Sequence, residues 1–179
     1  MADDKTKIDE DKQQDFPKRT NQLIALTALI LAICATFSSL YAGANASKGI
    51  LSQNKASDSW AYYQAKSMKE TMYRIQLDAL EIDPPANTNV AELKAKYKSE
   101  IERYDAEEEE IKATAIGHEA DRDKFLALNR GFAGALTYLQ IAILLTSLAG
   151  LMKQIGFWYA GIALGAFGVF NFLTTMSTM

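Results

Sequence analysis

The sequence predicts an all-α membrane protein with three transmembrane helices and a long antiparallel helical (coiled-coil) hairpin between the first and the second. Charge is segregated along the chain, since Lys153 is the only charged residue after Arg130. Apolar runs that can each span about 30 Å of hydrocarbon flank a polar stretch at residues 44–130. One proline-containing break divides that stretch into two parts of nearly equal length, as a hairpin requires.

The start of the chain predicts a polar tail at residues 1–20 and a first transmembrane helix at residues 21–43. No charge interrupts the apolar run at residues 23–42. A cleaved signal peptide is the alternative, because Lys18 and Arg19 precede the run and small residues follow it. The run is longer than the apolar core of a signal peptide, which favours a retained anchor.

The polar stretch, residues 44–130, predicts the hairpin, with its turn at residues 82–88. Pro84 breaks the helix because proline lacks the backbone donor and restricts the residue before it. Asn89 with Glu92 resembles a capping box that restarts a helix. Apolar residues in both halves recur at spacings of three and four residues or at combinations of these steps, which places them on one face of each helix. These faces, which we expect to pack together, comprise Ala61, Ala65, Met68, Met72 and Ile75, and then Val90, Leu93, Tyr97, Ile101, Tyr104, Ile111, Ala115 and Leu126.

The C-terminal part predicts two further transmembrane helices, at residues 131–152 and 155–176, separated by Lys153 and Gln154. Three crossings place the N-terminus on one side of the membrane and the hairpin on the other. Lys and Arg residues near the span ends number six on the N-terminal side and five on the hairpin side. The positive-inside rule therefore favours an N-terminus inside the cell and a hairpin outside it.

Small residues form two stripes within the second and third spans. In lipid, small residues let helices approach closely, so these stripes predict helix packing. The alternative is that glycine and alanine are simply common in membrane helices. The predicted packing residues are Ala142, Thr146, Gly150, Gly161, Gly165 and Gly168.

The densest group of aromatic and polar side chains is the string ASDSWAYYQAKS at residues 56–67. At 100° per residue, Ala61 and Ala65 are predicted to face the partner helix, Trp60 to lie on a flank and Tyr63 to point largely away. Two helices cover one face of each other, so aromatic residues spread around a helix predict further neighbours. The alternative is a surface on which tyrosine hydroxyls stay solvated. The predicted interaction residues are Asp58, Trp60, Tyr62, Tyr63, Gln64, Lys66 and Glu108.

Glu108 interrupts the apolar face of the second hairpin helix. With a turn centred near residue 85, it lies level with Tyr62, Tyr63 and Lys66. A carboxylate on a packed face costs several kcal/mol unless it is paired or hydrogen-bonded. We therefore expect a tyrosine hydroxyl and Lys66 to satisfy it and to fix the register of the hairpin. The alternative is that the apolar face drifts and leaves Glu108 in water.

The string at residues 56–67, placed between a first span and a long polar helix followed by two spans, resembles an uncharacterised bacterial membrane family, domain-of-unknown-function family 4337. The resemblance runs from about Leu23 to Met176. It implies a bacterial membrane protein with this topology, and hence a location in the inner membrane. Together with the distribution of Lys and Arg, this location predicts a cytoplasmic N-terminus and a periplasmic hairpin. It implies no activity and no catalytic residue.

Several function classes are disfavoured by the composition. The hairpin is acidic overall, whereas nucleic-acid binding needs a basic surface. One histidine, His118, and one cysteine, Cys34, offer neither a metal-ligand set nor a catalytic triad, so we expect no enzyme and no cofactor. We expect a structural or interaction protein, homo-oligomeric or accessory to a membrane complex, with the hairpin as a docking arm. The alternative is an oligomeric channel or transport component lined by the glycine-rich spans.

Overall fold

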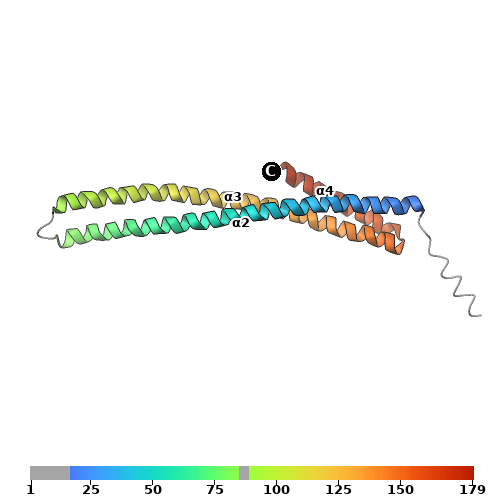
Figure 1. The fold of residues 1–179 in the computed structure, drawn as a ribbon, viewed down its shortest axis with the longest axis horizontal. Helices are drawn as coiled ribbons and strands as arrows, with labels where there is room; N and C mark the ends of the chain where they lie inside the picture. The colour runs from blue at the N-terminus through green and yellow to red at the C-terminus, as the bar shows by residue number, and fades with distance from the viewer. Residues whose placement is uncertain (1–16, 85–88) are drawn as a thin grey trace, which may run out of the picture. The chain divides into compact units, whose positions relative to one another are not determined.

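The computed structural model describes residues 17–84 and 89–179. Within them the chain forms three helices and no strand: α2 (Lys18–Ile82), α3 (Val90–Met152) and α4 (Ile155–Ser177) (Figure 1). The predicted all-helical fold is confirmed. Residues 1–16 of the predicted tail and residues 85–88 of the predicted turn lie outside the described residues.

The helix ends follow from local sequence. Helix α2 ends just before Asp83 and Pro84, where the chain can no longer continue a helix. At the start of α3, the Glu92 amide donates to Asn89 Oδ1 at 3.4 Å, and the Asn89 side-chain amide donates to the Glu92 carboxylate at 3.1 Å. Between α3 and α4, Lys153 adopts a left-handed backbone conformation with φ of 52°, which reverses the chain.

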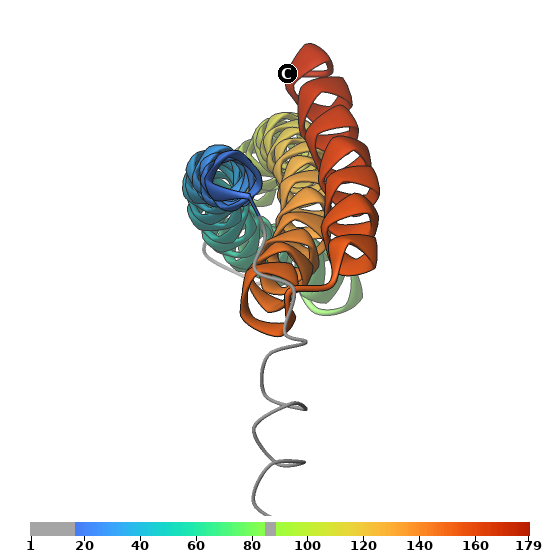
Figure 2. The same cartoon turned by 90° about the vertical axis from the view of Figure 1, so that its right-hand side faces the viewer.

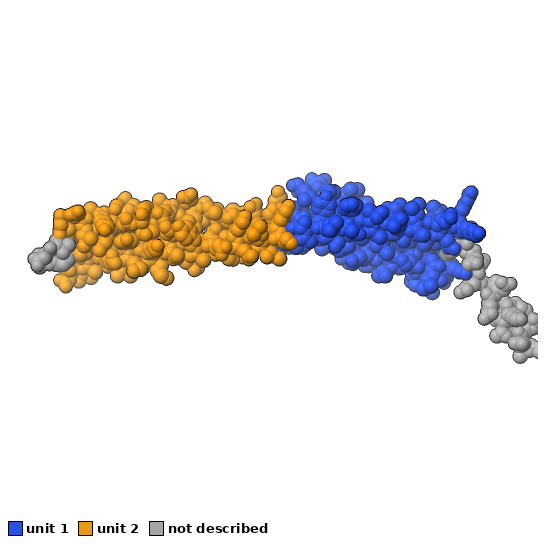
Figure 3. All heavy atoms as spheres, viewed as in Figure 1, with its two compact units in different colours: residues 1–46, 126–179 blue, residues 47–125 orange. Residues whose placement is uncertain are grey.

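All three helices are long and apolar enough to cross a membrane. Helix α2 has 65 residues and α3 has 63, so each combines a predicted span with a predicted hairpin arm in one unbroken helix. Residue contacts divide the described chain into two compact units, coloured in Figure 3. Unit 1 contains residues 17–46 and 126–179, and unit 2 contains residues 47–125 outside the undescribed turn.

Unit 1 is a three-helix cluster in which α4 lies beside the C-terminal part of α3 (Figures 1 and 2). Its core contains Leu31 and Ala35 of α2 with Leu139 and Ala142 of α3. The Ser38 hydroxyl donates to the backbone carbonyl of Phe132 at 2.8 Å, which satisfies a polar group inside this apolar core.

Unit 2 contains two helices that pack along a single seam. Every position of α2 at alternating spacings of three and four from residue 49 to residue 80 is buried or half-buried. The same holds on α3 at residues 90, 94, 97, 101, 104, 108, 111, 115, 118, 122 and 125. Contacts between the helices join rising numbers on α2 to falling numbers on α3. They include Gln53 with Arg122, Trp60 with Glu119, Lys66 with Glu107, Arg74 with Asp105 and Glu81 with Lys94.

The prediction of which α2 face meets α3 is wrong. Met68, Met72 and Ile75 are 68 %, 54 % and 61 % exposed, and the alanines predicted beside them are exposed too. The opposite face of α2 forms the seam because it carries larger rings. Tyr73 stacks on Tyr104 of α3 with ring centroids 5.9 Å apart. Burying aromatic rings removes more apolar surface from water than burying alanines does.

Candidate functional site

Two carboxylates from opposite helices lie on the seam of unit 2. Glu70 of α2 is 8 % exposed and Glu108 of α3 is 7 % exposed. The Glu70 carboxylate accepts a hydrogen bond from the Arg74 guanidinium one turn later in α2. Glu108 Oε1 is buried and has no hydrogen-bond partner. Glu108 is therefore on the packed face, as one of the two sequence interpretations expected.

Burial raises the pKa of Glu108, and the negative charge of Glu70 raises this pKa further. A hydrogen bond with the Tyr63 hydroxyl acts in the opposite direction. The pKa of Tyr63 is raised as well, first by burial and then by the charge of Glu108. Glu108 thus keeps its proton to higher pH than a solvated glutamate, and in that form it can donate a hydrogen bond to Glu70.

Lys66 pairs with Glu107, not with Glu108 as predicted. Lys66 Nζ lies 2.5 Å from Glu107 Oε2, and 5.3 Å from the ring centroid of Tyr104. This hydrogen bond raises the pKa of Lys66 and lowers the pKa of Glu107. Adjacent helix residues differ by 100° in direction, so Glu107 reaches the half-exposed edge of the seam while Glu108 points into it.

Trp60 and Tyr63 have their neighbours within the chain. Trp60 Nε1 donates to Glu119 Oε1 of α3 at 2.9 Å, and the rings of Trp60 and Tyr63 meet edge to face at 5.7 Å. Both residues are half-buried. The prediction that Tyr63 points away from α3 is wrong, because Tyr63 is a seam residue. The half-buried setting of Trp60 thus follows from the seam itself.

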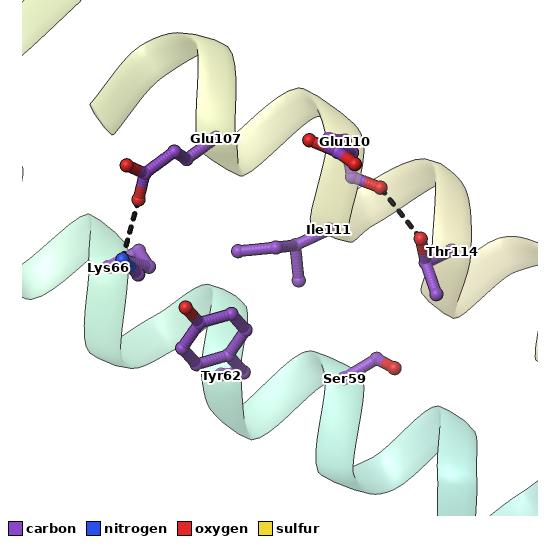
Figure 4. A pocket seen from close by; sticks show the side chains of 7 residues that line it. All are labelled: Ser59, Tyr62, Lys66, Glu107, Glu110, Ile111 and Thr114. Atoms are coloured by element: carbon purple, nitrogen blue, oxygen red, sulfur yellow. Dashed lines mark hydrogen bonds and ion pairs between the residues drawn. The ribbon is translucent and has the colours of Figure 1, made fainter. Parts of the chain in front are cut away.

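The remaining predicted interaction residues lie at the surface. Asp58 and Gln64 are exposed, and Tyr62 is 54 % exposed. Tyr62 lines a shallow groove of about 380 Å³ between the two helices, in which Lys66 and Glu107 point toward each other (Figure 4). Its lining residues are Ser59, Tyr62, Lys66, Glu107, Glu110, Ile111 and Thr114. Lys66, the cation that lines this groove, is already paired with Glu107. The groove is therefore a consequence of helix packing, and nothing in its lining indicates a ligand site.

Three residues of the site were not predicted from the sequence: Glu70, Arg74 and Glu119. A signal for Glu70 was present, because it follows Tyr63 by seven residues and so shares its position in a seven-residue repeat. To recognise that repeat, one would have to choose the more polar of the two candidate packing faces of α2.

Most of the predicted small residues of unit 1 lie at helix contacts. A Cβ added at Gly161 would lie 2.5 Å from Thr146 Oγ1, and one added at Gly165 would lie 2.6 Å from Leu31 Cδ2. One added at Gly168 would lie 2.9 Å from Leu139 Cγ. Ala142 and Thr146 are fully buried, whereas Gly150 is exposed and Ala149 is the buried residue of that turn.

The chemistry available in the described residues is that of packing and charge pairing. Among residues 17–84 and 89–179, no three His, Cys, Asp or Glu side chains are grouped so as to hold a metal ion. The carboxylate pair of Glu70 and Glu108 can share a proton, and Arg74 balances one negative charge. This arrangement suits a pH-responsive helix contact.

Comparison with known proteins identifies a family without assigning an activity. No curated protein and no solved structure matches the chain significantly. One family does match, described as "Domain of unknown function (DUF4337)", and the match covers residues 20–178. This range includes all three helices except the first two residues of α2. The chain therefore belongs to the family Domain of unknown function (DUF4337).

Proposed function

We propose that this protein is a non-catalytic membrane-anchored interaction protein, in which residues 44–130 form an antiparallel coiled coil that serves as a docking arm. The repeat of three and four along both seam faces supports the coiled coil, because this spacing keeps two helices in continuous contact. Three helices of sufficient length and apolarity support the anchor.

The observation that carries the docking role is the apolar surface that α2 exposes in unit 2. Met68, Met72 and Ile75 are each more than half exposed and share one helix face. Water-soluble surfaces seldom present large apolar residues in a continuous row unless another molecule covers them. The partner is a second copy of the chain or another subunit of a membrane complex.

The proposed location is the bacterial inner membrane, with a cytoplasmic N-terminus and a periplasmic arm. The distribution of Lys and Arg near the span ends supports this orientation. Cysteines introduced separately at Ala95 and at Met179, in a Cys34→Ala background, are expected to react with an impermeant maleimide from the periplasmic side. Labelling of the two positions from opposite sides would exclude three crossings, and labelling of both only from the cytoplasm would reverse the orientation.

The channel alternative is disfavoured because the glycines expected to line its pore are buried. Gly161, Gly165 and Gly168 are buried, and their contacts are with Thr146, Leu31 and Leu139 of the same chain. Residues held in such contacts are not free to face a pore.

The docking role is tested by the composition of the particle extracted from its native membrane. The full chain, released in polymer nanodiscs, is expected to give a particle that contains more than one polypeptide. Met72→Lys places a charge on the exposed apolar face and is expected to reduce the particle to a single chain. Ala95→Lys, at an exposed position of α3, is the matched control and is expected to leave the particle intact. A single-chain particle for the unsubstituted protein would refute the docking role.

A further inference from the structure

The apolar face exposed by α2 continues beyond Ile75 to the end of the helix. Its members recur at alternating spacings of four and three, and none carries a charge. All of them are exposed, and Ile82, at the end of α2, is 84 % exposed. We call this face the outer stripe; its residues are Ala61, Ala65, Met68, Met72, Ile75, Ala79 and Ile82.

The outer stripe lies on the side of α2 opposite the seam. Each of its residues from Met68 to Ile75 lies two or five positions from a seam residue. At 100° per residue, these separations place the two residues about 140–160° apart around the helix. Met68, for example, lies five residues after Tyr63, and Met72 lies two residues after Glu70. Helix α2 therefore offers two packing faces, of which α3 covers one.

We propose that the outer stripe packs against the outer stripe of a second copy of this chain, with the two α2 helices parallel. This inference rests on the proposed function and names the partner of the docking arm. A spacing of three and four residues is the spacing that another helix matches over several turns. A flat or irregular partner would use only part of a stripe that extends for about 32 Å along the helix axis.

The order of side-chain sizes on the outer stripe suits contact with an identical stripe. Alanines at positions 61, 65 and 79 lie on either side of the larger Met68, Met72 and Ile75, so that in a parallel pair the backbones can approach at the alanines while the long side chains of the two copies pack against each other. Methionine is unbranched and adapts to irregular gaps, which helps one face to fit its own copy.

The flanking residues also favour a second copy over a charged partner. Beside the stripe lie Tyr62, Gln64, Thr71 and Gln76, which carry no charge, and Lys69 and Asp78, which carry opposite charges. In a parallel pair of α2 helices, Gln64 lies next to Lys69 of the second copy and Thr71 lies next to Gln76 of the second copy. Both contacts allow hydrogen bonds, and neither opposes two like charges. Asp78 lies next to Asp83 of the second copy, a like-charge contact that falls at the end of α2. Two copies anchored in one bilayer also point the same way, as a parallel pair requires.

The contact is small, which sets the conditions for its detection. A stripe about 32 Å long and one helix face wide buries roughly 300 Å² per copy, compared with about 800 Å² per partner in a stable complex. Confinement in a membrane raises the effective concentration of the copies and compensates for this weakness. The contact is therefore to be measured in membranes, before dilution into detergent.

Disulfide trapping in isolated membranes tests the inference with the full chain. In a Cys34→Ala background, Ala65→Cys, Met72→Cys and Ala79→Cys each place a thiol on the outer stripe, where two copies in parallel bring identical positions together. A disulfide forms only when the two Cα atoms come within about 7 Å. Oxidation with copper phenanthroline is expected to give a product of twice the chain mass for all three variants. Ala95→Cys is the matched control, since it is also an exposed alanine and lies on α3; it is expected to give several-fold less of this product.

Each other outcome overturns the inference in a recognisable way. Equal dimer formation by Ala95→Cys would mean random collision. Dimers from Met72→Cys alone, together with mixed dimers of Ala65→Cys and Ala79→Cys, would mean an antiparallel contact. Adducts whose mass is not twice that of the chain would identify a different partner and leave the proposed docking role intact. If every thiol stays monomeric and reacts with maleimide as fast as the thiol at position 95, both the inference and the docking role fail.

Discussion

Unit 1 and unit 2 are built partly from the same two helices, yet these helices pack by different means in the two units. In unit 1 the fully buried side chains of α3 are mostly apolar: Phe132, Ala135, Leu139, Ala142 and Ala149 are all fully buried. In unit 2 the seam holds Glu70, Glu108 and four tyrosines, and its edges carry ion pairs. The difference reflects the number of helices, because α4 covers α3 in unit 1, whereas unit 2 has only α2 and α3.

The two units also treat their polar groups differently. In unit 1 most polar side chains bond to backbone carbonyls: the buried Thr146 hydroxyl donates to Ala142 in its own helix at 2.8 Å, and Ser38 of α2 donates to Phe132 of α3 at 2.8 Å. These donors are neutral, so these bonds bury no charge between the helices. In unit 2 most bonds across the seam involve carboxylates, as the bond from Trp60 to Glu119 does. Unit 1 therefore derives its specificity from shape, and unit 2 derives much of its specificity from charge.

The largest effect is expected from filling the close contact of α4 in unit 1. Gly161→Leu places a Cβ 3.0 Å from the backbone carbonyl oxygen of Ala142, which cannot move without shifting α3. We expect a loss of about 3 kcal/mol in the free energy of unfolding, the upper range for overpacking. The measurement is the temperature at which the purified protein loses its monodisperse peak in size-exclusion chromatography.

Gly156→Leu is the control for this substitution. It changes the same residue type on the same helix, and a Cβ at Gly156 meets nothing within 4 Å. Equal stability of the Gly161→Leu and Gly156→Leu variants would show that unit 1 does not depend on close contact between α3 and α4.

A smaller effect, of opposite sign, is expected in unit 2. Glu108→Gln removes a buried carboxylate that has one unpaired oxygen, and supplies an amide that can donate to Glu70. Leaving such a group unsatisfied costs about 1–3 kcal/mol, so we expect the variant to be more stable by about this amount at pH 7. The measurement is thermal unfolding followed by Trp60 fluorescence in a Trp158→Phe background.

The stability difference between Glu108→Gln and the unsubstituted protein is expected to depend on pH. The folded-state pKa of Glu108 is raised above its ordinary value of 4.5, so the stability that its protonated form contributes is present below pH 4.5 and is lost as pH rises through the raised pKa. The advantage of Glu108→Gln is therefore expected to grow between about pH 4.5 and neutral pH. Glu109→Gln, at an exposed neighbouring position, is the control and is expected to show no such trend. A constant difference across this pH range would rule out Glu108 as the titrating group.

The helices of this fold could be predicted because the residues that end each helix lie next to one another in the sequence. Pro84 ends α2, and Lys153 with Gln154 separates two apolar runs, so each break can be read from a few adjacent residues. The polar seam could not be predicted in the same way. Helix α2 carries two faces with the same spacing, and the more apolar one, which contains Met68 and Met72, is the one that α3 leaves exposed.

The contacts of the candidate site could not be predicted from the sequence for a related reason. Stacking of Tyr73 on Tyr104 depends on how two distant segments meet, and no local rule specifies it. Whether Lys66 reaches Glu107 or Glu108 depends on a rotation of 100° about α3, which is the step between adjacent residues. A pattern of apolar residues locates a helix face to within about this angle, and so does not distinguish the two carboxylates.

A third prediction tests the hydrogen bond between Trp60 and Glu119. Trp60→Phe keeps an aromatic ring beside Tyr63 but removes the donor that lies 2.9 Å from Glu119 Oε1. We expect unit 2 to lose about 1 kcal/mol, the usual net contribution of such a bond. Protection of unit 2 amides in hydrogen exchange provides the measurement. Trp158→Phe in unit 1 is the control; if it lowers that protection as much as Trp60→Phe does, the bond to Glu119 has no special role.

The smallest effect concerns the ion pair that replaces the one predicted between Lys66 and Glu108. A double-mutant cycle with Lys66→Met and Glu107→Gln is expected to show coupling in thermal unfolding, because the atoms are 2.5 Å apart at the half-buried edge of the seam. The cycle with Lys94→Met and Glu81→Gln is the control and is expected to show less coupling, since that pair is 3.6 Å apart and more exposed. The lowered pKa of Glu107 adds a second criterion: its stabilising contribution is present above the ordinary pKa of 4.5 and is lost as pH falls through the lowered value. Coupling that persists in acid, or equal coupling in the two cycles, would mean that unit 2 does not use this charge pair to align its helices.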